Sequence, residues 1–330
     1  MRTFCVIAKG CDPRENLALE EYLINNCQTD EVWLYLWRNE NTVVIGRNQN
    51  PWRECDMQAI KQDGVTLVRR QSGGGAVFHD LGNLNFTFIA DKKLYNLQKQ
   101  LGVVIKALEG FGLHAEFSGR NDILLNGKKF SGNAFSHKAE VSMQHGTLLI
   151  DSNMQRLSKY LNPSKAKLEA KGVQSVRSRV CNLSDYEKSI NGESLALALI
   201  KAFEAEYKRL DATVYSDQLD KNDYKELIDK YSSWEWTVGE TPQYRMTFEN
   251  RFVWGEVQLC LDVKNGGISR AAIYTDAMDA ELMQKIAQGM VGVRACGQDV
   301  AAAICSTAQA SDSSGGNMQS ELGDWIKTVL

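Results

Sequence analysis

Three consecutive glycines interrupt the chain between two strand-like runs, within the segment RRQSGGGAVFHDLGNLNFTF at residues 69–88. Glycine has no Cβ and tolerates positive φ, so successive backbone N–H groups can converge on an anion or lie flat against a ligand. Arg70 precedes the glycines, and His79 and Asp80 follow them. A flexible hairpin is the alternative for three glycines alone. Because charged and titratable residues flank them on both sides, the pattern favours a binding loop.

Length and composition limit the architectures to which this loop can belong. The chain has 330 residues, 43% of them hydrophobic, and single cores stop growing at roughly 250–300 residues, so we expect two domains. The formal net charge of −3 leaves no basic footprint for nucleic acid. No run of about 18 apolar residues occurs, and the N-terminus lacks a cleavage signature. We therefore expect a cytoplasmic protein whose partners are small molecules or proteins, with no nucleic acid and no membrane among them.

The eight cysteines are scattered, without a C-x-x-C pair or a histidine at zinc spacing. We therefore expect neither disulfides nor a structural metal, and we expect most of these thiols to be buried small side chains in a reducing compartment. Cys181 closes the polar run SVRSRVCNLS. A thiol in such a segment could also be a nucleophile.

Local patterns predict helices and strands in mixed order. Asp12-Pro13 is typical of a helix start, with an N-cap acid followed by proline at the first helical position. Apolar residues at helical spacing predict a helix over 97–111, and the alternation in residues 83–89 predicts a strand with one apolar and one polar face. No regular βαβ repeat occurs, so we expect an α+β fold with a mixed sheet. Further strands are expected at 32–37, 42–45, 65–69, 114–117, 122–125 and 147–150, and helices at 154–161 and 194–207.

The C-terminal part has a pattern of its own. Apolar density falls over residues 211–233, which predicts a connecting segment. Two β runs, at 256–263 and 268–275, then flank a Lys-Asn-Gly-Gly turn and precede an amphipathic helix over 282–290. Residues 306–320, rich in Ser, Gly, Ala and Asn, are typical of a mobile loop before a final short helix. We therefore divide the chain into a large domain at 1–245 and a small α+β domain at 246–330.

A second polar segment surrounds the turn Asn126-Gly127. Asn121 and Asp122 enter a short β run before the turn, and Lys129 follows it. An Asn-Gly turn between two β runs predicts a hairpin that brings Asp122 and Lys129 onto neighbouring strands. Such a pair suits a nucleotide site, because the carboxylate can hold Mg²⁺ and the ammonium can offset phosphate charge. An exposed hairpin with a surface charge pair is the alternative.

The common phosphate-binding motifs G-x-x-x-x-G-K-[ST] and G-x-G-x-x-G before a helix are absent. Several segments together instead resemble the lipoate–protein ligase A family. They are LWRNENTVVIGRNQNPWRE, RRQSGGGAVFHDLGN, GRNDI, KKFSGNAF, HGTLL and LNPSKAKLEAKGVQSVRSRVCNLS, which occur in the family's order. SSWEW and FVWGEVQL resemble the family's accessory C-terminal domain.

The resemblance implies an enzyme that activates lipoic acid with ATP and Mg²⁺ and attaches the lipoyl group to a lysine of a protein. The implied acceptors are the apo lipoyl domains of 2-oxoacid dehydrogenase E2 subunits and the glycine cleavage H protein, and use of octanoate is left open. Residues 1–245 would be the catalytic domain. Its fold would be the one shared by biotin ligases and class II aminoacyl-tRNA synthetases, a mixed β-sheet flanked by helices.

The resemblance also assigns site residues, position by position. Lys129 in K-F-S-G would contact both the nucleotide phosphate and the lipoyl carboxyl oxygen, and Asp122 would be the carboxylate of the magnesium site. The other contacts with ATP and lipoyl-AMP would come from Arg70, Ser72, Gly73, Gly74, Gly75, Ala76, Val77, Phe78 and Asn121. The lipoate pocket would be formed by Trp37, Arg70, Gly75, His79, Lys129 and His145.

Electrostatics agrees with the role that the resemblance gives Lys129. When a carboxylate attacks the α-phosphate, two anions approach each other, and a cation shared by both lowers the barrier where charge accumulates. The group that takes the proton from the acceptor lysine stays open: His79 and His145 are candidates by type, and either can be a hydrogen-bonded structural residue. Trp37 and Phe78 can line a slot for the apolar dithiolane and acyl chain, and Trp37 can equally belong to the sheet core.

Other interpretations stay open beside the complete ligase. An octanoyl- or lipoyltransferase would take its acyl group from a carrier protein through a thioester on Cys181, or use preformed lipoyl-AMP, without ATP activation. A non-catalytic lipoate-binding protein is favoured by loss of Lys129 or of the glycines, and neither is lost. The domain after Trp234 favours the ligase, because simple transferases of this superfamily lack it.

Overall fold

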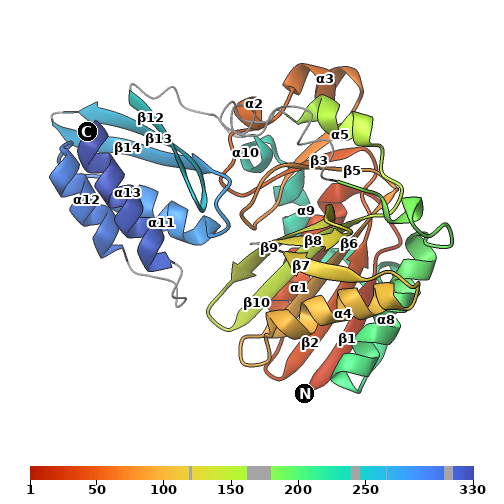
Figure 1. Ribbon diagram of the computed structural model, residues 1–330. Coiled ribbons are helices and arrows are strands. Elements are labelled where there is room, and N and C mark those ends of the chain that lie inside the picture. Colours follow the sequence, from red (N-terminus) through yellow and green to blue (C-terminus); the bar gives the residue numbers. More distant parts are fainter. Residues whose placement is uncertain (119–120, 162–179, 239–245, 265, 308–314) are drawn as a thin grey trace. The chain divides into compact units, whose positions relative to one another are not determined.

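The computed structural model describes residues 1–118, 121–161, 180–238, 246–264, 266–307 and 315–330 (Figure 1). The chain folds as two compact units. The first unit comprises Met1–Val44, Trp52–Arg69 and Val77–Thr237, and the second comprises Ile45–Pro51, Arg70–Ala76 and Val238–Leu330. The glycine loop therefore belongs to the second unit. Residue 245, where we expect the first domain to end, lies outside the described residues, and that domain boundary stays a prediction.

An eight-stranded mixed sheet forms the centre of the first unit. Its strand order is β11-β1-β2-β6-β10-β9-β8-β7, with β1 parallel to both β2 and β11 and the other neighbours antiparallel. This sheet confirms the mixed α+β fold class. The strands are β1 (Arg2–Ile7), β2 (Glu31–Trp37), β6 (Asn83–Asp91), β7 (Ala115–Ser118), β8 (Asp122–Leu125), β9 (Lys128–His137), β10 (Val141–Leu149) and β11 (Ala212–Tyr215).

Strict alternation gives this sheet two different faces. On β6, Leu84, Phe86 and Phe88 point into an apolar core, whereas Asn83, Asn85 and Thr87 point to the opposite side. The core is closed by two helices, α4 (Leu97–Glu109) and α8 (Gly192–Tyr207), which pack against each other (Figure 1). The opposite face carries polar side chains beside a second apolar cluster.

Helix α1 (Pro13–Asn26) packs on the polar side of the sheet. Asp12 caps the helix by accepting hydrogen bonds from the N–H groups of Arg14 (2.7 Å) and Glu15 (3.4 Å), which confirms the predicted helix start. Leu17 and Ile24 join a second apolar cluster with residues of β2 and β6. Further helices in the described part of this unit are α2 (Pro51–Glu54), whose Pro51 falls in the second unit, α3 (Met57–Gln62), α5 (Met154–Tyr160), α9 (Lys225–Ser232) and α10 (Trp234–Thr237).

A small sheet brackets the glycine loop. Its order is β4-β3-β5, with β4 (Thr66–Arg69), β3 (Thr42–Ile45) and β5 (Val77–His79). Residues 70–76 connect β4 to β5, both of which neighbour β3. The loop therefore begins and ends at fixed strands.

The C-terminal part of the second unit is an antiparallel sheet with three helices. The strands are β12 (Met246–Phe252), β13 (Gly255–Lys264) and β14 (Gly267–Thr275), and the helices are α11 (Ala280–Gly289), α12 (Gly297–Ser306) and α13 (Gly315–Val329). Their side chains share one apolar core, which includes Leu259, Ile286 and Ile304. The two predicted β runs and the helix after them are confirmed. The final helix is confirmed as α13, but it begins at Gly315, so the loop expected over 306–320 is wrong from that residue onward and at Ser306, which ends α12. Residues 308–314 of that loop lie outside the described residues.

No helix in the described ranges is both long and apolar enough to cross a membrane.

Phe86→Ala tests the apolar core. Phe86 is fully buried beside Phe88, with 5.6 Å between ring centroids. Because truncation leaves a cavity, the free energy of unfolding should fall by about 3–5 kcal/mol in urea denaturation. Leu197→Ala is the control, since Leu197 is 61% exposed on α8, and its effect should stay within about 0.5 kcal/mol. Equal effects of the two substitutions would contradict the placement of Phe86.

Candidate functional site

The polar face of the large sheet collects predicted site residues from four strands. The register pairs Trp37 with Asn85, and Thr87 with both Tyr35 and His145, so these side chains share one face. The same face continues through Ala134 on β9, which pairs with His145, to Gly132 and Asp122. Sheet pairing therefore brings Trp37, His145 and Asp122 to one surface although they are far apart in the sequence.

Lys129 and Asp122 form an ion pair on the β8–β9 hairpin. The turn residues Asn126 and Gly127 have φ values of 50° and 74°, as an Asn-Gly hairpin requires. The Lys129 ammonium lies 2.6 Å from an Asp122 carboxylate oxygen, and the two side chains are 35% and 37% exposed. The predicted hairpin is confirmed, and both side chains of the pair are partly exposed.

Asn121 fastens the start of β8 to β9. Its side-chain amide donates to the carbonyl oxygen of Asn133 at 3.1 Å, and its own carbonyl accepts from the backbone and side chain of Asn133 at 2.8 and 3.1 Å. These bonds fix the strand entry that carries Asp122.

The Cys181 segment supports the strand of Lys129 through its backbone. The N–H of Cys181 donates to the carbonyl of Lys129 at 2.9 Å, and Val180 forms a β-bridge with Lys129. The thiol is 5% exposed within the apolar core. Burial raises the pKa of the Cys181 thiol, so little reactive thiolate forms at neutral pH.

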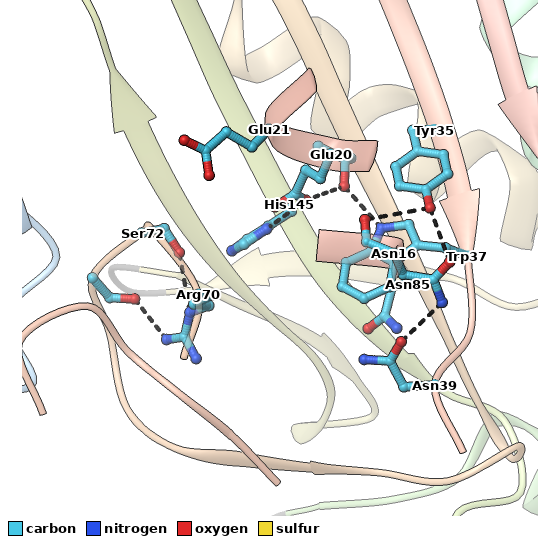
Figure 2. A network of polar contacts seen from close by, with 12 residues as sticks. Asn16, Glu20, Glu21, Tyr35, Trp37, Asn39, Arg70, Ser72, Asn85 and His145 are labelled. Atoms are coloured by element: carbon cyan, nitrogen blue, oxygen red, sulfur yellow. Dashed lines mark hydrogen bonds and ion pairs between the residues drawn. The ribbon is translucent and has the colours of Figure 1, made fainter. Parts of the chain in front are cut away.

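A buried carboxylate orients two of the predicted pocket residues. Glu20 of α1 is fully buried. One of its carboxylate oxygens accepts from the Thr87 hydroxyl at 2.6 Å and lies 2.8 Å from Nδ1 of His145 (Figure 2). Trp37 donates through Nε1 to the Thr87 hydroxyl at 3.0 Å. Trp37 and His145 are therefore fixed by one network that centres on Glu20.

Another chain of hydrogen bonds holds His79. Asn16 donates to the side-chain oxygen of Asn39 at 3.0 Å, and the amide nitrogen of Asn39 lies 3.3 Å from Nδ1 of His79. Tyr35 donates to the side-chain oxygen of Asn16 at 3.2 Å (Figure 2). His79 also packs edge-on against Trp37. Both predicted pocket histidines thus lie in buried hydrogen-bond networks.

Sequence reasoning missed Glu20, although a signal was present. Glu20 lies three residues after Leu17 and four before Ile24, on the apolar stripe of α1. A carboxylate at such a position must find hydrogen-bond donors when the helix packs. This interruption of the stripe points to a buried polar site.

Arg70 braces the glycine loop from within. Its guanidinium donates to the carbonyls of Gly73 (2.6 Å) and Gly75 (2.9 Å) and to the hydroxyl of Ser72 (3.0 Å), and the residue is 6% exposed (Figure 2). The guanidinium has five N–H donors in a rigid plane, so one arginine can bind several backbone and side-chain oxygens of the loop at once. The structure therefore gives Arg70 and Ser72 a shared role in the shape of the loop.

The three glycines occupy different surroundings. A methyl placed on Gly73 would lie 2.3 Å from the carbonyl oxygen of Met278 and 2.4 Å from that of Ala277. Gly74 has a φ of 88° and donates its N–H to Ala277 at 3.1 Å. A methyl on Gly75 would meet nothing within 4 Å. Close packing thus requires glycine at 73, and the backbone at Gly75 is open.

The residues after the glycines lead into β5. Val77 pairs with Val44 of β3, and the neighbouring Phe78 is 2% exposed. The Phe78 ring lies 5.2 Å from that of Tyr160 and is covered by the Arg156 guanidinium at 5.1 Å. The side chain of Phe78 is therefore part of the protein interior.

Two family models match this chain in sequence. The lipoyl protein ligase A/B catalytic domain matches residues 12–204, and the bacterial lipoate protein ligase C-terminus matches residues 241–326. The chain belongs to the lipoate–protein ligase A family. The first match alone spans more than half of the chain.

Relatives agree with membership of the lipoate–protein ligase A family. A lipoate-protein ligase A of Psychrobacter cryohalolentis is 44% identical over 299 residues, covering 88% of each chain. The structure of P. falciparum LipL1 with lipoate has a TM-score of 0.88 at 31% identity and covers 99% of both chains. A lipoate-protein ligase A bound with ATP has a TM-score of 0.63 at 27% identity, covering 72% of this chain and 99% of that one. The chain is accordingly an enzyme of the ligase class.

Gly73→Ala tests the packing of the loop. The added methyl would displace the backbone at Ala277 and Met278, so we expect the free energy of unfolding to fall by about 1–3 kcal/mol. Hydrogen exchange at the Gly74 amide should accelerate. Gly75→Ala is the matched control, and it should change the unfolding free energy by no more than about 0.5 kcal/mol. Similar behaviour of the two variants would refute the close approach at Gly73.

Proposed function

We propose that this chain activates lipoate with ATP to give lipoyl-AMP and pyrophosphate, and then transfers the lipoyl group to a lysine of apo lipoyl domains. The proposed acceptors are the E2 subunits of 2-oxoacid dehydrogenases and the glycine cleavage H protein, in the cytoplasm. The observation that carries the proposal is the half-exposed Lys129–Asp122 pair at 2.6 Å. The relatives bound to lipoate and to ATP support both substrates.

In the first half-reaction a carboxylate oxygen of lipoate attacks the α-phosphorus of ATP, and the bond to pyrophosphate breaks. Negative charge accumulates where the two anions meet. The Lys129 ammonium, which remains partly exposed beside Asp122, offsets that charge in the transition state. We also propose that the backbone at Gly75 contacts the nucleotide, because a methyl there would meet nothing within 4 Å.

Asp122 fits a magnesium site. Mg²⁺ is commonly held by one or two carboxylates together with substrate phosphates. Within the described ranges, no group of three or more His, Cys, Asp or Glu side chains could hold a metal by itself. A single partly exposed carboxylate such as Asp122 suits an ion that is also bound by the substrate phosphates. When bound, Mg²⁺ neutralises phosphate charge.

The second half-reaction needs an activated acyl group that is protected from water. The acceptor amine attacks the acyl carbon, the bond to AMP breaks, and the amine loses a proton. We propose that Trp37, His79 and His145 lie around the acyl chain, because their buried networks leave these side chains in fixed orientations. The mixed anhydride reacts with water, so the pocket that holds it has to exclude water.

The alternatives are weaker on the same geometry. A thioester on Cys181 requires a thiolate that its burial and raised pKa disfavour. A non-catalytic binding protein has no need of a partly exposed ammonium beside a carboxylate. A transferase that uses preformed lipoyl-AMP would keep these residues, and the assay below separates it from the ligase.

Lys129→Ala tests the activation step. Lipoate-dependent exchange of labelled pyrophosphate into ATP should occur with the parent and fall by about 100- to 1000-fold in the variant, because one stabilising cation is lost. Lys285→Ala is a control, since Lys285 pairs with Glu281 on α11. Absence of exchange in the parent, together with transfer from added lipoyl-AMP, would establish the transferase instead.

Cys181→Ser tests the thioester alternative. We expect the variant to modify a lipoyl domain at a rate within about threefold of the parent, because the backbone N–H that supports Lys129 is retained. In the native parent, iodoacetamide should label the exposed Cys305 before the buried Cys181, as read by mass spectrometry. Complete loss of transfer in Cys181→Ser, with the fold intact, would favour the carrier-protein route.

A further inference from the structure

A glycine lies directly opposite Asp122 in the β8–β9 ladder. The register pairs Asp122 with Gly132, and the N–H of Gly132 donates to the Thr147 hydroxyl at 3.2 Å. Gly132 has no positive φ, so its backbone does not require glycine. Another cause must account for the missing side chain.

A β-bulge brings Lys129 to the same face as Gly132. Ile123 pairs with Ser131, but the next residue, Leu124, pairs with Lys129, so Phe130 is an extra residue on β9. Plain alternation would place Lys129 and Gly132, three positions apart, on opposite faces. The hairpin pairs Lys129 with Leu124, on the face that carries Asp122, and the bulge shifts the alternation by one so that Gly132 joins Lys129 on that face. Phe130 itself is fully buried in the apolar core.

The Lys129 side chain lies over the bare Cα of Gly132. A methyl placed on Gly132 would lie 2.9 Å from the Lys129 ammonium nitrogen and 3.0 Å from its Cε. Apart from its own chain neighbours, no other described atom would come within 4 Å of that methyl. A side chain at 132 would therefore displace the lysine and leave the strand in place.

We propose that Gly132 and the bulge at Phe130 together form a seat for the Lys129 ammonium, which makes Gly132 a positioning residue for the activation step. The bulge places the bare Cα of Gly132 opposite Asp122, and the missing Cβ leaves room for the Lys129 nitrogen beside that carboxylate. The backbone bond from Cys181 to Lys129 holds the strand on its other side. The placement of the Lys129 ammonium by Gly132 does not depend on the proposed function. Its effect on the activation step does rest on that function.

The first test is Gly132→Ala in the full-length chain. The melting temperature should match that of the parent, since alanine suits this strand backbone. Pyrophosphate exchange should fall roughly 10- to 100-fold in kcat, the usual effect of a small misplacement of a reacting group. Gly102→Ala is the matched control, because a methyl at Gly102 on α4 meets nothing within 4 Å, and its exchange rate should equal that of the parent.

A second measurement reads the seat without catalysis. Limited acetylation with N-hydroxysuccinimide acetate, followed by mass spectrometry, should label Lys129 faster in Gly132→Ala than in the parent, because the ammonium has lost its contact with Asp122. Lys285 in the same samples is the internal reference. Unchanged labelling of Lys129 would overturn the seat, whether or not the chain exchanges pyrophosphate.

A double-mutant cycle decides whether Gly132 acts through Lys129. The probe is lipoyl-sulfamoyl-adenosine, a non-hydrolysable analogue of lipoyl-AMP, with affinity measured by calorimetry. Gly132→Ala should weaken binding in the parent and change nothing in the Lys129→Ala background. An equal loss in both backgrounds would overturn the inference. Absence of exchange and of binding in the parent would count against the proposed function alone, and the labelling result would still decide the seat.

Discussion

The alternation of side chains across the eight-stranded sheet is the constraint on which the rest of this structure depends. Phe86 and Phe88 point to a core closed by α4 and α8. Their neighbours Asn85 and Thr87 on the same strand point to the polar face. Since the period is two residues, a slip of one position would exchange the core for the site. The bulge at Phe130 is the one place described above where the chain departs from this alternation, and there the departure serves Lys129.

Much of the fold could be predicted because its signals are local. The cap at Asp12, the Asn126-Gly127 hairpin and the alternating run of β6 each follow from neighbouring residues, and the structure confirms them. The juxtaposition of Lys129 and Asp122 follows from the hairpin alone. The wider set of site residues came from the resemblance to a family, and the functional roles given to these residues stay predictions.

The elements that were missed depend on distant partners. β11 lies in the segment that we expected to connect two domains, and its pairing with β1 joins residues about two hundred positions apart. β10 begins at Val141, earlier than the expected strand at 147–150, because Gln144 and His145 break the apolar pattern while buried. The contacts of Glu20 could not be predicted from α1 alone, because its partners Thr87 and His145 lie on two strands of the sheet. Buried polar residues are therefore where sequence patterns and structure disagreed.

The assignment of residues 45–51 and 70–76 to the second unit means that the chain passes from one unit to the other five times. Asn48 donates to the carbonyl of Ala280 at 2.8 Å, and Gly74 donates to Ala277 at 3.1 Å. The two parts are consequently not interchangeable modules. A chimaera that borrowed its C-terminal residues from a relative would also have to inherit the matching loop segments, and substitutions around Ala277 would have to evolve together with those near Gly73.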